Sequence, residues 1–131
     1  MAKVEKFEDL RIWQMARELC KEVYRHTETL PWKSDIRFVQ QIRAAAGSIM
    51  DNIAEGYERD GNKEFIQFLY VAKGSCGEVR SQIVRATDVK FLDHADAKKL
   101  YESCVELSGA IAAFIKSMKK SAIAGAKYKG V

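Results

Sequence analysis

Two histidines, His26 and His94, are the side chains of this chain best suited to acid–base or metal chemistry near neutral pH. Di-iron helical bundles need Glu-x-x-His on each of two helices, because a carboxylate and an imidazole must reach the same metal. Neither histidine follows an acid at that offset, and neither follows an arginine at the spacing that one class of helical ribonucleases uses. We therefore expect no metal site and no ribonuclease site.

Motifs for nucleophilic catalysis and phosphate binding are also missing. The two histidines give no support for a Ser-His-Asp or Cys-His arrangement. The run Gly74-Ser75-Cys76-Gly77 lacks the Gly-Lys-Ser/Thr ending of a phosphate loop and lies inside a helical pattern. Cys20, Cys76 and Cys104 are too widely spaced for a metal site or a disulfide framework, so we interpret them as reduced core residues. We predict a protein without enzymatic activity or cofactor.

Basic side chains offer the remaining chemistry, since lysine and arginine bind the phosphates of nucleic acids. The net charge is only +4, and all of the basic excess lies in residues 116–131, which contain no acid. Lysines in the last turns of a helix also suit the helix dipole, which is the structural alternative. The candidate nucleic-acid contacts are Arg43, Arg59, Lys63, Lys116, Lys119, Lys120, Lys127 and Lys129.

Small residues repeat at helical spacing on two segments, away from the main apolar positions. Tyr70, Gly74, Gly77 and Ser81 form one strip, and the preceding segment carries another with Ala44, Gly47 and Ala54. A glycine within a helix costs about 1 kcal/mol relative to alanine, so a purely solvent-facing position gives no reason for it. These strips favour contact with another subunit, and tolerated surface glycine is the alternative.

A polar line accompanies the apolar positions of the second segment. Gln41, Ser48, Asn52 and Glu55 follow each other at steps of 7, 4 and 3. Such a line forms either a buried hydrogen-bonded network or an exposed face, and the residues alone favour the exposed face.

The elements that must position these residues are helices. Pro31, the break at 60–62 and the break at 90–94 divide the chain into four segments with apolar residues at steps of three and four. In the third segment, Phe65, Leu69, Ala72, Cys76, Val79, Ile83 and Ala86 share one face. We predict helices over 8–28, 35–58, 62–90 and 94–120.

Four helices with short connections run antiparallel in sequence order. We therefore predict an all-α, antiparallel up-down-up-down four-helix bundle over 8–120 in a single domain 1–131, with a flexible basic C-terminal tail at 121–131. No stretch approaches the ~18 apolar residues of a membrane span, and the N-terminus lacks a signal-peptide core. We expect a cytoplasmic protein with no membrane contact.

Several blocks of the sequence resemble the bacterial four-helix bundle proteins called 23S rRNA intervening sequence proteins, or S23. The blocks are Phe7 to Gln14, Gln41 to Ala45, Ser48 to Tyr57 with its Asn-Ile-Ala-Glu-Gly motif, Lys63 to Leu69, and Gly74-Ser75 with Glu78. The match runs from about residue 7 to residue 118. The family name refers to reading frames found within insertions in 23S rRNA genes and does not by itself establish a ribosomal function.

The resemblance implies a four-helix protomer that assembles into a homopentamer. It also implies that Asn52, Glu55, Ser75 and Glu78 make polar contacts between helices or between subunits. Our leading hypothesis is a non-enzymatic homo-oligomer whose assembled surface binds RNA or DNA. The alternative is a scaffold or accessory subunit that binds protein and has no direct nucleic-acid role.

Overall fold

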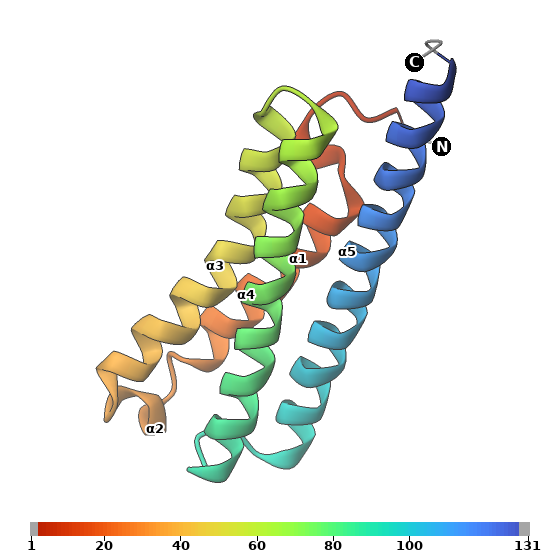
Figure 1. The fold of residues 1–131 in the computed structure, drawn as a ribbon. Helices are drawn as coiled ribbons and strands as arrows, with labels where there is room; N and C mark the ends of the chain where they lie inside the picture. Colours follow the sequence, from red (N-terminus) through yellow and green to blue (C-terminus); the bar gives the residue numbers. More distant parts are fainter. Residues whose placement is uncertain (1–2, 129–131) are drawn as a thin grey trace.

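The structure, a computed structural model, describes residues 3–128, with side chains described up to Ser121. Within this range every regular element is a helix, and four of the helices are long (Figure 1). In chain order the elements are the 3-10 helix η1 (Phe7–Asp9) and the α-helices α1 (Arg11–His26), α2 (Leu30–Lys33), α3 (Ile36–Glu58), α4 (Asn62–Asp88) and α5 (His94–Tyr128).

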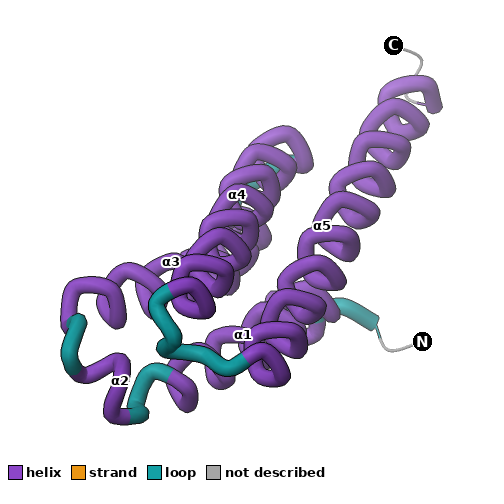
Figure 2. The backbone as a smooth tube through the Cα atoms, turned by 90° about the horizontal axis from the view of Figure 1, so that it is seen from below, coloured by secondary structure: helices purple, strands orange, loops and turns teal. Residues whose placement is uncertain are grey.

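The helices and the absence of strands among the described residues confirm the predicted all-α bundle. The four long helices run alternately up and down, which is compatible with the predicted antiparallel order (Figure 1). Each long helix contacts its two neighbours around the bundle, in the order α1, α3, α4, α5. The contacts of α4 with α3 and α5 are the most extensive, and the contact between α1 and α5 is the smallest of the four. Consequently α5 lies away from α3 (Figure 2).

The predicted apolar faces meet at the centre of the bundle. On α4, six of the seven predicted core positions are buried, and Phe65 at the start of the helix is half-buried. The other helices contribute the same kind of stripe at steps of three and four. The largest fully buried side chains include Ile42, Ile49, Ile53, Leu69, Ile83, Leu107 and Ile111.

One glycine fixes how closely α3 and α4 approach. A Cβ added at Gly56 would lie 2.7 Å from Cβ of Phe68 and 2.9 Å from Cδ1 of Phe65. Atoms cannot approach this closely without displacing each other, so the crossing depends on the missing side chain. Gly56 belongs to the Asn-Ile-Ala-Glu-Gly motif, and packing between the two helices gives its physical reason.

The sequence-based boundaries differ from the structure by a few residues at several helix ends, and three differences bear on the argument. Helix α1 begins at Arg11 because residues 7–9 form a separate 3-10 turn. Pro31, read as a break, instead lies in the first turn of α2, where proline fits because its missing N–H needs no partner. Helix α5 continues to Tyr128, so the tail boundary predicted at 121 falls inside a helix.

The short helix α2 anchors the connection between α1 and α3. Trp32 is 1% exposed, and its ring centroid lies 5.0 Å from that of Phe38 and 5.2 Å from that of Phe91. These aromatic contacts join the α1–α3 connection to the α4–α5 connection at the same end of the bundle.

Candidate functional site

A polar network crosses the interface between α3 and α4. The Ser48 and Ser75 hydroxyl oxygens lie 2.9 Å apart, and Nδ2 of Asn52 donates to the Ser48 carbonyl oxygen at 2.8 Å and to its hydroxyl at 2.9 Å. All three side chains are half-buried. The structure thus places Asn52 and Ser75 in a contact between helices of one protomer, and it brings them together through Ser48.

The other two residues implied by the resemblance, Glu55 and Glu78, lie outside this network. Glu55 accepts a hydrogen bond at 3.0 Å from Arg59, the residue that follows α3, with both side chains about half exposed. Glu78 is exposed and lines a shallow groove of about 470 Å³ between α3 and α4. The small side chains of Ala44, Ser48 and Ser81 also line this groove. Gln82, which is 7% exposed, lines it too, and its Oε1 has no hydrogen-bond partner among the described residues.

The predicted small-residue strip on α4 faces outward. Tyr70, Gly74, Gly77 and Ser81 are all exposed, and a Cβ added at either glycine would meet nothing within 4 Å. Gly47 on α3 has the same open space, beside the exposed Ala44. Packing within the chain therefore gives no reason for these glycines, in contrast to Gly56.

Two of the predicted phosphate contacts are engaged inside the protomer. Nε of Arg43 donates to Oγ1 of Thr27 at 2.9 Å, and its guanidinium lies over the Tyr24 ring at 4.5 Å. This arginine joins α3 to the end of α1. Arg59 pairs with Glu55 and also lies over the Phe68 ring at 5.2 Å.

The predicted lysines with described side chains gather at one end of the bundle. Lys63 begins α4, and Lys116, Lys119 and Lys120 lie towards the end of α5, which is the same end (Figure 1). All four are exposed, and Nζ of Lys119 donates to the Tyr70 hydroxyl at 2.6 Å. Arg59 shares this end, whereas Arg43 lies towards the middle of α3. The side chain of Lys127 and all of Lys129 lie outside the described residues.

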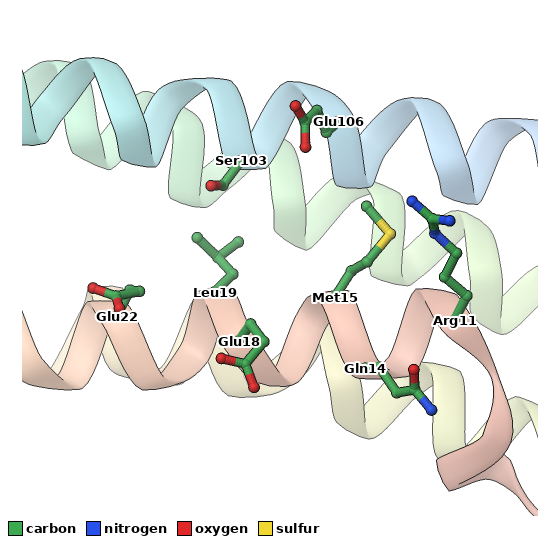
Figure 3. A pocket seen from close by; sticks show the side chains of 8 residues that line it. All are labelled: Arg11, Gln14, Met15, Glu18, Leu19, Glu22, Ser103 and Glu106. Atoms are coloured by element: carbon green, nitrogen blue, oxygen red, sulfur yellow. The ribbon is translucent and has the colours of Figure 1, made fainter.

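A groove between α1 and α5 was not predicted from the sequence. Its volume is about 570 Å³, and Met15 and Leu19 form an apolar floor (Figure 3). Carboxylates rim it from both helices, with Glu18 and Glu22 on α1 and Glu106 on α5; Arg11, Gln14 and Ser103 complete the lining. The only sequence signal was the set of acids on these two segments, because the groove itself depends on how far the helices stand apart.

The histidines and cysteines do not combine into a reactive centre in the described part of the chain. His26 lies between two carboxylates, with Nε2 3.8 Å from Glu22 and Nδ1 4.0 Å from Asp96. All three cysteines are free. The described side chains hold no group of three or more histidine, cysteine or acidic residues that could bind a metal ion.

Two buried thiols face each other across α4 and α5. The Cys76 thiol donates to the backbone carbonyl oxygen of Cys104 at 3.2 Å, and both residues are buried. The interaction with Cys76, followed by burial, raises the pKa of the Cys104 thiol. Burial, followed by the negative charge of Asp51, also raises the pKa of Cys20. Thiols held in the protonated form are poor nucleophiles, because the thiolate is the reactive species.

Both the sequence and the fold are similar to known proteins. Residues 8–113 match the sequence model of the 23S rRNA-intervening sequence protein family. The fold is similar to the crystal structure of a protein of unknown function from the S23 ribosomal protein family of Bacteroides thetaiotaomicron. That match has a TM-score of 0.73 and 16% identity, and it covers 80% of this chain and 98% of the other. No curated protein matches this chain. Within the described residues, no helix is long and apolar enough to cross a membrane.

Proposed function

This chain belongs to the 23S rRNA-intervening sequence protein family, and from that premise we propose that it is a non-enzymatic protein that assembles with copies of itself and binds RNA or DNA through its assembled surface. The proposal includes the homopentamer that the family resemblance implies and a cytoplasmic location. The family name describes where related genes were found, so the argument for function depends on the surfaces of this protomer.

Self-assembly is supported above all by the outward glycines of α4. Gly74 and Gly77 lie in the interior of a helix, where each costs about 1 kcal/mol of helix stability relative to alanine. Both are exposed, and neither is needed for a close approach within the chain. Because neither glycine has a side chain, the backbone of a second subunit could pack closely against this flat face between Tyr70 and Ser81.

Nucleic-acid binding is supported by the lysines that share one end of the bundle. Lys63, Lys116 and Lys120 are exposed and form no ion pair with another described residue. One such cluster on a chain of net charge +4 attracts phosphates only weakly. Several copies in one assembly present several clusters, and simultaneous binding multiplies their effect.

The proposal is tested by measuring the mass of the protein in solution and then titrating the same sample with labelled single-stranded and structured RNA. We expect a mass several times the protomer mass of 14.8 kDa. We also expect binding that weakens steeply between about 50 and 200 mM salt, because phosphate contacts release counterions. A monomer would contradict self-assembly. An assembly that ignores nucleic acid at both salt concentrations would favour the protein-binding scaffold instead.

The absence of catalysis is tested separately. Purified protein incubated with RNA and DNA, with and without divalent metal ions, should leave both intact. Cleavage that co-purifies with the protein and is lost on substitution of one residue would overturn this part of the proposal.

A further inference from the structure

We infer that the acid-rimmed groove between α1 and α5 receives the lysine-bearing end of α5 from a second copy of this chain. The inference rests on the proposed self-assembly and names the two surfaces that meet. It assigns Lys116 and Lys120 to the contact between subunits, so that Lys63 is the exposed lysine of this end that remains available to phosphates. One surface is the groove with its apolar floor, and the other is the exposed end of α5.

The groove has the chemistry of a site for a basic helix. Met15 and Leu19 supply an apolar floor, and the carboxylates of Glu18, Glu22 and Glu106 stand on both sides of it (Figure 3). Glu106 forms no ion pair with any described residue. Glu18 and Glu22 pair with exposed bases on their own helix, at 3.4 Å and 2.6 Å, and Glu22 also lies 3.8 Å from Nε2 of the mostly buried His26. Exposed pairs of this kind contribute little, so an incoming lysine can replace them.

The described end of α5 presents exposed lysines beyond the last buried residue of the helix. Ile115 is the last described residue of α5 that is buried, and the helix continues to Tyr128 (Figure 1). Lys116, Lys119 and Lys120 are exposed in this segment, and residues 116–131 contain no acid. These exposed lysines complement an acidic groove in charge.

The segment cannot reach the groove of its own chain. Glu106 is on the same helix as the lysines, and ten residues of α-helix place Lys116 about 15 Å further along the axis. A continuous helix leads away from the groove and does not fold back on it. The occupant must therefore come from another molecule.

The lysines also continue the surface already proposed for assembly. Lys119 donates to the hydroxyl of Tyr70, the first residue of the outward strip on α4. The strip and the end of α5 thus form one surface of the protomer, and the α1–α5 groove forms a different one. An interface between two different surfaces is head-to-tail, and such interfaces close into rings when the rotation between subunits permits.

Two charge-reversed variants test the inference. Glu18→Lys with Glu106→Lys reverses the groove, and Lys116→Glu with Lys120→Glu reverses the helix end; all four side chains are exposed, so the bundle core is unchanged. We expect each variant alone to dissociate at concentrations at least about tenfold higher than the unmodified protein, because like charges now meet. Mixing the two variants should restore association, since each supplies the complement of the other.

A matched control reverses two exposed acids outside the groove, Asp60→Lys with Asp88→Lys, and should leave the assembly mass unchanged. Light scattering on each sample gives the mass, and circular dichroism verifies helix content. Unchanged mass in the groove variant, equal loss in the control, or no recovery on mixing would overturn the inference. If Gly77→Glu on the strip dissociates the protein while the charge reversals do not, self-assembly stands and the groove is not its site. A monomeric unmodified protein overturns both.

Discussion

The hydroxyl oxygens of Ser48 and Ser75 lie 2.9 Å apart and bridge α3 and α4 at a half-buried point of their interface. Asn52 donates to Ser48 from one turn further along α3, so a single hydroxyl connects three side chains. The partners of this network are mutually dependent, because each half-buried polar group would otherwise lose its hydrogen bond where water has limited access.

Replacing Ser48 with alanine should lower the free energy of unfolding by about 1 kcal/mol, because the Ser75 hydroxyl then loses its partner on α3. The double variant with Ser75→Ala should be less destabilised than the sum of the two single variants, by about 0.5 kcal/mol or more. Urea unfolding followed by circular dichroism measures all three. Strict additivity would show that the two hydroxyls do not interact.

Replacing Gly56 with alanine should lower the free energy of unfolding by about 1–3 kcal/mol despite the better helix propensity of alanine. The added Cβ would lie 2.7 Å from Cβ of Phe68, a part of the side chain that cannot rotate away. Gly109→Ala is the matched control on α5, since its Cβ would meet nothing within 4 Å. The control should be neutral or stabilising by up to about 1 kcal/mol.

Replacing Arg43 with alanine should destabilise the protomer by about 1–2 kcal/mol through loss of the Tyr24 stacking and the hydrogen bond to Thr27. Its effect on RNA affinity should be small, because the guanidinium is already engaged between α3 and α1. Thermal unfolding and an RNA titration on the same variant separate the two effects. A large loss of affinity with unchanged stability would restore Arg43 as a phosphate contact.

Replacing Lys63 with alanine should leave stability unchanged within about 0.5 kcal/mol, since it is an exposed side chain outside the proposed contact between subunits. If this end of the bundle binds phosphates, RNA affinity should fall, and the slope of log K against log salt should decrease by about 1 for each lost contact. Titrations at several salt concentrations give the slope. An unchanged slope would remove Lys63 from the binding surface.

Because the pKa of the Cys104 thiol is raised, we predict that the protein loses stability at alkaline pH. The pKa of this thiol in the folded protein is raised by the interaction with Cys76 and by burial, whereas an unfolded cysteine ionises near about pH 8.5. The fold favours the neutral thiol, and this preference stabilises the folded protein. The stabilisation is fully present below about pH 8.5 and is lost as pH rises towards the pKa of the folded protein.

Above about pH 8.5 the slope from one such thiol is at most about 1.4 kcal/mol per pH unit. Unfolding measured from neutral to alkaline pH should therefore show a shallower decline in Cys104→Ala than in the unmodified protein. That variant is less stable at neutral pH because it leaves a small cavity. Equal slopes of stability against pH in the two proteins would show that ionisation of Cys104 does not cause the loss of stability at alkaline pH.

Periodicity was enough to predict the four long helices and most of the core, because apolar residues at steps of three and four can share a face only in a helix. It could not predict α2 (Leu30–Lys33), since four residues are too few to show a period. The sequence also indicated a break at Pro31, whereas the structure places this proline in the first turn of α2.

The surfaces were harder to predict than the fold. The strip from Tyr70 to Ser81 could be placed on the outer face of α4 because its spacing alone fixes that position. Arg43 could not be separated from Lys63, because a basic residue on a helix has the same spacing whether it packs on Tyr24 or faces solvent. The α1–α5 groove depends on the separation of two helices, which no residue spacing within either helix encodes.

The order of contacts around the bundle has a consequence for how the chain folds. The most extensive contacts join α3 to α4 and α4 to α5, which are consecutive helices linked by short connections. Native contacts at short sequence separation lose little loop entropy when they form, so these hairpins can nucleate early and the protomer belongs among fast-folding proteins. We expect helix α1, which is held by its contacts to α3 and by its smaller contact to α5, to dock after these hairpins have formed.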